Sequence, residues 1–209
     1  LPFETRMTVV RLAGGGLWLH SPVAPTPARL EAAAALGPVE HLVAPNLIHS
    51  LGVAPWKAAH PEATVWVSPG FAARHPDLPA DIAFGPRIRP PWSGEIEHGL
   101  IEGHALLDEV VFLHRRSATL IVTDLIQKHD PARERWLWRQ VKGLAGVLGR
   151  RGGTSRDIRL TVRDRAAFRR SVARVLDWEF DNLVISHGFC VKGGAKDEVR
   201  RALAWTGAA

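Results

Sequence analysis

Cysteine is nearly absent from this sequence, since Cys190 is the only one in the chain. A single thiol excludes an intramolecular disulfide and a cysteine-rich zinc module. Long apolar runs are missing too, because no stretch approaches the roughly 18 consecutive apolar residues that indicate a transmembrane helix. The N-terminal stretch LPFETRMTVVRL has no apolar core of the signal-peptide type. We therefore expect a cytoplasmic protein that has no membrane partner.

Tyrosine is absent altogether, whereas arginine supplies most of the positive charge. Between Arg133 and Arg174 there are thirteen arginines and lysines but only three acidic residues, so this segment has a net charge of +10. Such a basic segment can attract anions. The lack of tyrosine, one of the aromatic residues that stack on bases, argues against a nucleic-acid partner. One interpretation of the segment is a solvated helical face without a specific partner, and the other is a surface that favours an anionic small-molecule substrate.

The overall composition is that of a folded globular protein, because 46% of the 209 residues are hydrophobic and 23% are charged. A chain of this length buries roughly 70% of the surface that its unfolded form exposes. It therefore needs neither a disulfide nor a structural metal to fold. We predict one domain over residues 1–209, with residues 1–6 as a disordered edge.

The first half of the chain alternates predicted strands with helices. Residues 7–12 and 17–20 are typical of two strands of a hairpin around a glycine-rich turn. Residues 41–45 and 64–68 are typical of short buried strands, and a helical segment precedes each of them. This order predicts parallel strands with helices on the sheet face. Residues 69–100 are rich in proline, glycine and charge, which predicts a long irregular connection.

Capping residues indicate where helices begin. Thr26 followed by Pro27 suits the N-cap and the first position of a helix. Asp130 followed by Pro131 repeats this pattern, and we expect the helix there to run to about Leu148. The apolar residues of that predicted helix fall at helical spacing: Leu137, Val141, Leu144 and Leu148.

Two tryptophans of the same predicted helix lie only two positions apart, at Trp136 and Trp138. Side chains at this spacing do not face the same side of a helix. At least one of them is therefore expected at the surface or against a neighbouring molecule. We predict a homodimer contact on this basis, with packing under the long connection at residues 69–100 as the alternative.

The second half of the chain shows another hairpin and another buried strand. Residues 109–113 and 119–124 form the predicted hairpin, and residues 182–186 form the buried strand. A helix is expected after Asp164, with one apolar face made of Phe168, Val172, Val175 and Leu176. The chain has no glycine-rich phosphate loop after its first strand and no G-x-S-x-G motif. A simple Rossmann domain and a serine hydrolase are therefore excluded.

The chain contains ten histidines, and several of its polar residues stand next to predicted strands. His49 follows the strand at 41–45, and His104 precedes the strand at 109–113. Asp124 and His187 each end a strand. Active sites of α/β folds lie at such strand ends. Imidazole nitrogens together with a carboxylate suit zinc, iron or manganese, and a bound metal generates a nucleophile from water near neutral pH. His20 ends another strand and could face the same pocket, and His114 is expected in a surface turn. The other histidines are expected at the surface or in caps: His41, His60, His75, His98 and His129.

Four stretches together resemble a known superfamily: RMTVVRL…LWLHSP, HLVAPNLIHSLGVAPWKAAHPEA, EVVFLHRRSATLIVTDLI and ISHGFCVKGGA. Over about residues 6–205 the chain is similar to the metallo-β-lactamase fold superfamily, and most similar to an uncharacterised branch of it, a domain-of-unknown-function family. The resemblance implies an α/β fold, the four-layer αββα sandwich of the metallo-β-lactamase type. It also implies metal ligands: Asp124 in TDLI, His187 in SHG and His104 in EGH resemble the superfamily's later ligands.

The first motif of the superfamily, H-x-H-x-D-H, is degenerate in this chain, where the matching stretch is P-N-L-I-H-S. Pro45 and Leu47 stand in place of the two leading histidines. His49 falls at the aspartate position, and Ser50 falls at the last histidine. A complete dinuclear zinc site is therefore not expected, and a mononuclear site or a metal-free pocket remains.

Three functions stay open from the sequence. The first is a metal-dependent hydrolase in which His49, His104, Asp124 and His187 hold one zinc, iron or manganese ion, with Asp124 and His49 as catalytic residues. Its substrate would be an unknown small molecule with an ester-like, amide-like or phosphoester bond. The alternative is a metal-free, non-catalytic member of the same fold that acts as a binding or interaction module. A nucleic-acid processing protein is a third reading, which would require salt-sensitive binding to RNA or DNA.

Overall fold

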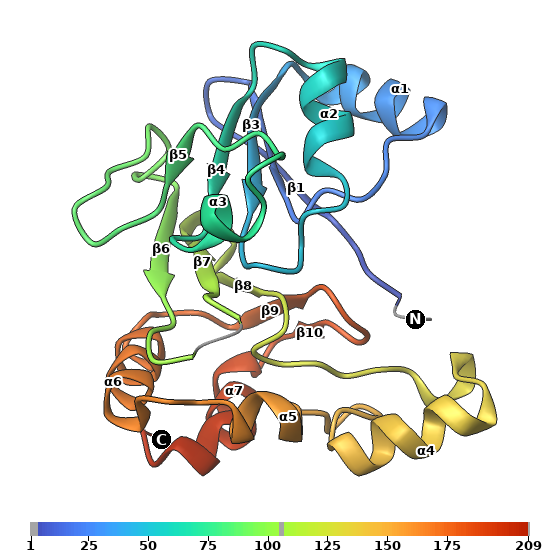
Figure 1. Cartoon of the computed structure of the whole chain (residues 1–209), viewed down its shortest axis with the longest axis vertical. Coiled ribbons are helices and arrows are strands. Elements are labelled where there is room, and N and C mark those ends of the chain that lie inside the picture. Colours follow the sequence, from blue (N-terminus) through green and yellow to red (C-terminus); the bar gives the residue numbers. More distant parts are fainter. Residues whose placement is uncertain (1–3, 105–106, 209) are drawn as a thin grey trace. The chain divides into compact units, whose positions relative to one another are not determined.

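The computed structural model describes residues 4–104 and 107–208. Within these residues the chain forms two compact units, each with a five-stranded sheet and a hydrophobic core (Figure 1). We call Arg6–Glu95 the N-terminal unit, and we call Ile96–Ala209 together with Leu1–Thr5 the C-terminal unit.

Two sequence-based expectations concern the chain as a whole. The single domain over residues 1–209 stays a prediction. The expected disordered edge, residues 1–6, includes residues 1–3, which lie outside the described residues. Among the residues that the structure describes, no helix is both long and apolar enough to cross a membrane.

The sheet of the N-terminal unit has the strand order β1-β2-β3-β4-β5. Its strands are β1 (Thr8–Arg11), β2 (Leu17–His20), β3 (Val39–Ala44), β4 (Thr64–Val67) and β5 (Ile82–Ala83). The first two strands pair antiparallel, as the predicted hairpin requires, and the other neighbours are parallel. The hairpin and the parallel strands predicted from the sequence are therefore confirmed.

Three helices belong to this unit: α1 (Pro27–Leu36), α2 (Val53–Ala59) and α3 (Phe71–Arg74). The N-cap prediction is confirmed, because the Thr26 side chain accepts a hydrogen bond from the backbone N–H of Arg29. Alternate residues of the strands pack in the core with residues of these helices, among them Trp56 of α2. The other face of the sheet carries Trp18 and Trp66, both of which pack against Trp92.

The sheet of the C-terminal unit has the strand order β10-β9-β8-β7-β6. Its strands are β6 (Ile96–Leu100), β7 (Val110–His114), β8 (Thr119–Val122), β9 (Asn182–Ile185) and β10 (Val191–Lys192). The pair β7 and β8 is the predicted second hairpin, and β8 pairs parallel with β9. The expectation of an irregular connection over residues 69–100 is wrong in part, because α3, β5 and β6 lie in it.

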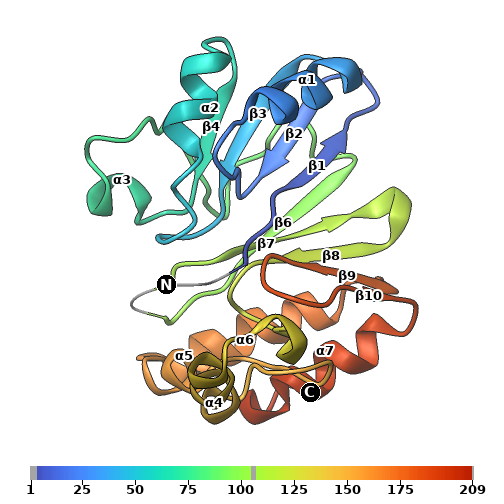
Figure 2. The same ribbon diagram turned by 90° about the vertical axis from the view of Figure 1, so that its right-hand side faces the viewer.

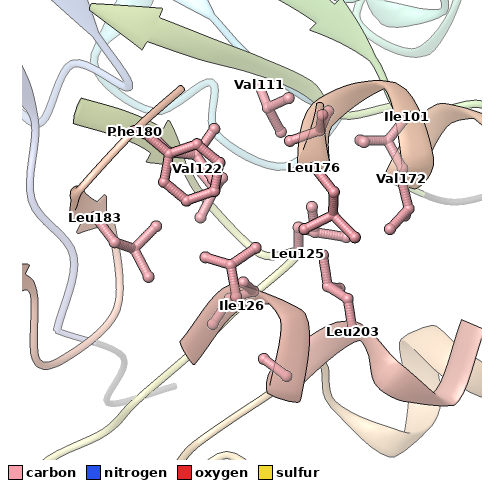
Figure 3. Packing of buried hydrophobic residues seen from close by; sticks show 14 of the residues in the cluster. Ile101, Val111, Val122, Leu125, Ile126, Val172, Leu176, Phe180, Leu183 and Leu203 are labelled. Carbon is pink, nitrogen blue, oxygen red and sulfur yellow. The ribbon is translucent and has the colours of Figure 1, made fainter. Parts of the chain in front are cut away.

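The helices of this unit are α4 (Trp136–Ala145), α5 (Arg156–Leu160), α6 (Arg165–Leu176) and α7 (Ala195–Leu203), with 3₁₀ helices η1 (Arg115–Ser117), η2 (Pro131–Arg133) and η3 (Ala204–Thr206). Helices α6 and α7 lie on one face of the sheet (Figure 2). Val172 and Leu176 of α6 and Leu203 of α7 pack with Leu125 and Ile126, which follow β8 (Figure 3). The predicted apolar face of α6 is thus confirmed as core.

The prediction of one helix from Pro131 to about Leu148 is wrong. Asp130 caps only the short helix η2, and α4 begins later, at Trp136. The apolar residues predicted at helical spacing do not form a buried face, because Leu137 is 60% exposed and Leu144 is 69% exposed. Lys142 is buried instead, next to Glu134, with which it forms an ion pair. A buried ion pair, and not the apolar stripe, therefore sets which side of α4 faces inward.

Candidate functional site

Asp124 and His187 lie together because two parallel strands end side by side. Val122 at the end of β8 is paired with Ile185 at the end of β9. Asp124 follows Val122 by two residues, and His187 follows Ile185 by two residues, so both side chains are placed at the same sheet edge. The Nε2 atom of His187 lies 3.3 Å from the Oδ1 atom of Asp124, and both side chains are buried.

The backbone carbonyl of Glu4 determines which nitrogen of the His187 ring carries the proton. The Nδ1 atom of His187 lies 2.8 Å from the carbonyl oxygen of Glu4. A carbonyl oxygen only accepts hydrogen bonds, so Nδ1 carries the proton. In the neutral ring the Nε2 lone pair then faces the Asp124 carboxylate, and two electron-rich atoms meet at 3.3 Å. This arrangement favours a cation between them, either a proton or a metal ion.

The surroundings of His187 also determine how readily its ring takes up a second proton. Burial alone lowers the pKa of His187, but the hydrogen bond and the charge of Asp124 outweigh burial and raise the pKa above its usual value. Without a metal ion, a proton on Nε2 therefore satisfies the pair.

Glu109, a residue that the sequence reasoning missed, holds the backbone around Asp124. Its fully buried carboxylate accepts hydrogen bonds from the N–H groups of Thr123 at 2.7 Å, Asp124 at 3.0 Å and Leu125 at 2.9 Å. Burial, and then the charge of Asp124, raise the pKa of Glu109 to about 7. The only sequence signal was an acid directly before the apolar strand β7.

A second group of buried polar side chains extends from the same oxygen atom of Asp124, Oδ1. The Nε2 atom of Gln127 donates to Oδ1 of Asp124 at 3.1 Å. His129 lies 3.0 Å from the Gln127 amide oxygen, and Lys142 lies 3.2 Å from the other ring nitrogen of His129. Burial, and then the charge of Lys142, lower the pKa of His129 to about 4. The expectation that His129 lies at the surface or in a cap is wrong, since it is 1% exposed.

Gly188 allows the chain to pass close to the segment that carries these residues. The N–H of Lys128 donates to the His187 carbonyl, and the N–H of Phe189 donates to the Lys128 carbonyl, both at 2.9 Å. Gly188 has a φ of +100°, and an added Cβ would lie 1.9 Å from the Lys128 carbonyl oxygen. Only glycine fits this left-handed and crowded position.

His104 is held by a different set of contacts in the same unit. Its Nδ1 atom accepts a hydrogen bond from the Leu107 N–H at 2.9 Å. Its Nε2 atom lies 3.1 Å from the Ile158 carbonyl oxygen and 2.9 Å from the Thr161 hydroxyl. Burial lowers the pKa of His104. Both ring nitrogens are engaged in these contacts, and the assignment of His104 as a metal ligand stays a prediction.

His49 belongs to the N-terminal unit, in the loop after β3. The Asn46 side chain accepts hydrogen bonds from the N–H groups of Ile48 at 3.0 Å and His49 at 2.9 Å, which shapes this loop. The Nδ1 atom of His49 is hydrogen-bonded to the Ser21 hydroxyl. The roles of His49 as a ligand and as a catalytic residue stay predictions.

The sequence of the chain matches one protein family. The profile of the family described as a domain of unknown function, DUF4336, matches residues 2–133. No curated protein is significantly similar to the chain in sequence.

Several solved structures share the fold over nearly the whole chain. A metallo-β-lactamase from Pontibacter korlensis is 15% identical, with a TM-score of 0.61 over 98% of this chain and 88% of that one. A metallo-β-lactamase from Erythrobacter litoralis is 15% identical, with a TM-score of 0.65 over 99% and 86%. The metallo-β-lactamase FIM-1 from Pseudomonas aeruginosa, solved in a mono-zinc form, is 15% identical, with a TM-score of 0.61 over 98% and 84%.

At this identity the likeness shows the fold, which is mixed α/β with two sheets and helices as the sequence predicted. The chain belongs to the DUF4336 family and has the metallo-β-lactamase fold.

Proposed function

We propose that the chain binds a divalent metal ion, zinc first, through Asp124 and His187, and that it acts as a hydrolase of a small substrate. The observation that supports this most is the geometry of the pair. The Glu4 carbonyl keeps the proton of His187 on Nδ1, and Nε2 lies 3.3 Å from Oδ1 of Asp124. A metal-ligating histidine usually donates its other ring N–H to a carbonyl or carboxylate in this way.

The donor set fits one metal ion better than two. An imidazole nitrogen and a carboxylate oxygen suit zinc, iron and manganese. In the loop after β3, the side chains of Pro45 and Leu47 contain no donor atom for a second ion. The mono-zinc form of FIM-1 is an example of one ion in this fold. We propose His49 and His104 as the further ligands, in keeping with the resemblance of the sequence.

A bound ion of this kind supplies Lewis acidity and lowers the pKa of a coordinated water molecule. Residues of the chain hold the two proposed ligands in position. Glu109 holds the backbone at Asp124 through three hydrogen bonds, and the Glu4 carbonyl orients the His187 ring. We propose Asp124 and His49 as the catalytic residues of the set.

The charge of the chain supports an anionic substrate. The segment from Arg133 to Arg174 carries a net charge of +10, and most of its arginines are exposed. A basic surface raises the local concentration of anions. We therefore propose a small anionic molecule with an ester, amide or phosphoester bond as the substrate.

One observation favours a second function, a metal-free binding module on the same fold. Three positions of the first ligand motif hold Pro45, Leu47 and Ser50, none of which provides the usual imidazole. If the remaining donors bind no metal tightly, the pocket would bind a ligand without cleaving it.

Metal content distinguishes the two functions. The protein is purified without a histidine tag or chelator, and zinc, iron and manganese are quantified per chain. We expect about one equivalent in the wild type, lost in the Asp124→Ala/His187→Ala double variant. His114→Ala is the matched control, because His114 contacts Ser117 in the turn after β7. Absence of metal in the wild type, even after dialysis against zinc or manganese, would reject the hydrolase and leave the binding module.

A further inference from the structure

Lys142 begins a series of hydrogen bonds whose direction is determined by elimination. A lysine ammonium group donates and never accepts, so the Nδ1 atom of His129, at 3.2 Å, must be the acceptor. A neutral imidazole carries one proton, which must then lie on Nε2 of His129. The ammonium of Lys142 therefore selects the tautomer of His129.

The tautomer of His129 in turn orients Gln127. The Nε2–H group of His129 needs an acceptor, and the Gln127 amide oxygen lies 3.0 Å away. With its oxygen directed to His129, the amide presents its NH₂ group to Asp124, and it donates to Oδ1 at 3.1 Å. Each step permits only one orientation of the next group.

These groups lie away from solvent. Lys142 is 2% exposed, His129 is 1% exposed and Gln127 is 8% exposed. Hydrogen bonds in such surroundings are stronger than in water, and an unmade bond is costly. The charge of Lys142 is balanced by its ion pair with Glu134, whose side chain is buried too. Because each unmade bond would be costly, we expect the hydrogen bonds of the series to be formed together.

We propose that Lys142 is a positioning residue, which fixes the carboxylate of Asp124 through His129 and Gln127. The inference rests on the proposed function in one respect, namely that Asp124 is a metal ligand. It adds that the buried side of α4, the α-helix that follows β8 in the chain, determines how well the ligand is held. Lys142 contacts neither metal nor substrate in this role.

Metal affinity tests the consequence of this series. Zinc affinity is measured by competition with a chromophoric chelator for the wild type, Lys142→Met and Gln127→Met. Gln127→Met keeps the ion pair between Lys142 and Glu134, so it tests the connection to Asp124 if Lys142→Met folds poorly. We expect both variants to bind zinc about 10–100-fold more weakly, the usual effect of removing a residue that orients a ligand.

Lys196→Met is the control. Lys196 of α7 has a side chain that is 20% exposed and pairs with Glu179 at 2.9 Å, so the variant also removes a lysine and its ion pair. We expect its zinc affinity to stay within about twofold of the wild type, which is the additive behaviour of a residue outside the series. Equal zinc affinities for Gln127→Met and Lys196→Met would overturn the proposal.

A measurement on the metal-free protein separates this inference from the proposed function. The ¹⁵N resonances of the His129 ring report its tautomer. We expect a protonated Nε2 in the wild type and a loss of this preference in Lys142→Met. A protonated Nδ1 in the wild type would overturn the series whatever the metal result. A wild type that binds no zinc but has the expected tautomer would reject the metal site alone.

Discussion

The carboxylate of Glu109 accepts a hydrogen bond from the backbone N–H of Asp124 at 3.0 Å, although fifteen positions separate the two residues. Glu109 is 1% exposed, and it also accepts from the N–H groups of Thr123 and Leu125. The turn that carries Asp124 is therefore held by a side chain from the start of the neighbouring strand.

Replacing Glu109 by alanine is expected to destabilise the protein strongly. Three buried N–H groups would lose their acceptor, and each such loss costs about 1–3 kcal/mol. We expect the free energy of unfolding from urea titration to fall by at least about 3 kcal/mol. Glu40→Ala is the control, because the Glu40 side chain is 50% exposed. A Glu109→Ala variant as stable as the control would show that the three contacts do not hold the turn.

Gly188→Ala is expected to disturb the chain directly after His187. The added Cβ would lie 1.9 Å from the Lys128 carbonyl oxygen, at a φ of +100°. We expect a loss of more than about 2 kcal/mol in unfolding free energy, from both strain and the broken contact. Gly194→Ala separates these causes, because Gly194 has a φ of +69° but no atom within 4 Å of an added Cβ. Equal losses in the two variants would mean that the close approach is unimportant.

The N-terminal unit is expected to lose stability in mild acid through His41. Burial lowers the pKa of His41 from 6.5 to about 4, and its side chain is only 12% exposed. The unfolded chain therefore takes up a proton below about pH 6.5 that the folded protein does not bind. This difference destabilises the folded state progressively between about pH 6.5 and 4, by about 2 kcal/mol at pH 5.

The corresponding measurement is urea unfolding at pH 7.5 and pH 5 for the wild type and His41→Phe. Phenylalanine retains the ring contact with Trp92, whose centroid lies 4.4 Å from that of His41, but it does not titrate. We expect the variant to lose less stability between the two pH values. Parallel pH dependence in both proteins would exclude His41 as the cause.

The exposed apolar face of α4 is expected to tolerate polar residues. Leu137 and Leu144 are 60% and 69% exposed, so Leu137→Gln/Leu144→Gln should change the unfolding free energy by less than about 1 kcal/mol. Leu203→Gln is the contrasting variant, because Leu203 is fully buried in the core with α6. Sedimentation velocity tests the predicted homodimer on the same samples. A dimer that dissociates only in the double variant would place this face at its interface.

Local sequence signals were sufficient for many elements of the fold. Thr26 and Pro27 predicted the start of α1, and two short strand-like segments around a turn predicted each hairpin. These features depend on residues a few positions apart, which is the range over which capping and side-chain periodicity act. The placement of Asp124 and His187 after two strands was readable for the same reason.

The orientation of α4 could not be predicted in this way. Its apolar spacing indicated a buried face, yet Leu144 is exposed and Lys142 is buried. Periodicity shows that a helix has two faces, but the partners available in the fold decide which one turns inward. Here the partners of Lys142 are Glu134 and His129, whose combined hydrogen bonds and charge balance its burial.

The sequence by itself determined the α/β class, the strands that carry the candidate ligands, and the loss of histidines from the motif around Pro45 and Leu47. Only the tertiary structure brought Glu4 to His187, across 183 positions, and Glu109 to Asp124. The reason is physical: a buried polar group must find a hydrogen-bond partner wherever the packed chain supplies one, and that partner has no fixed distance along the sequence.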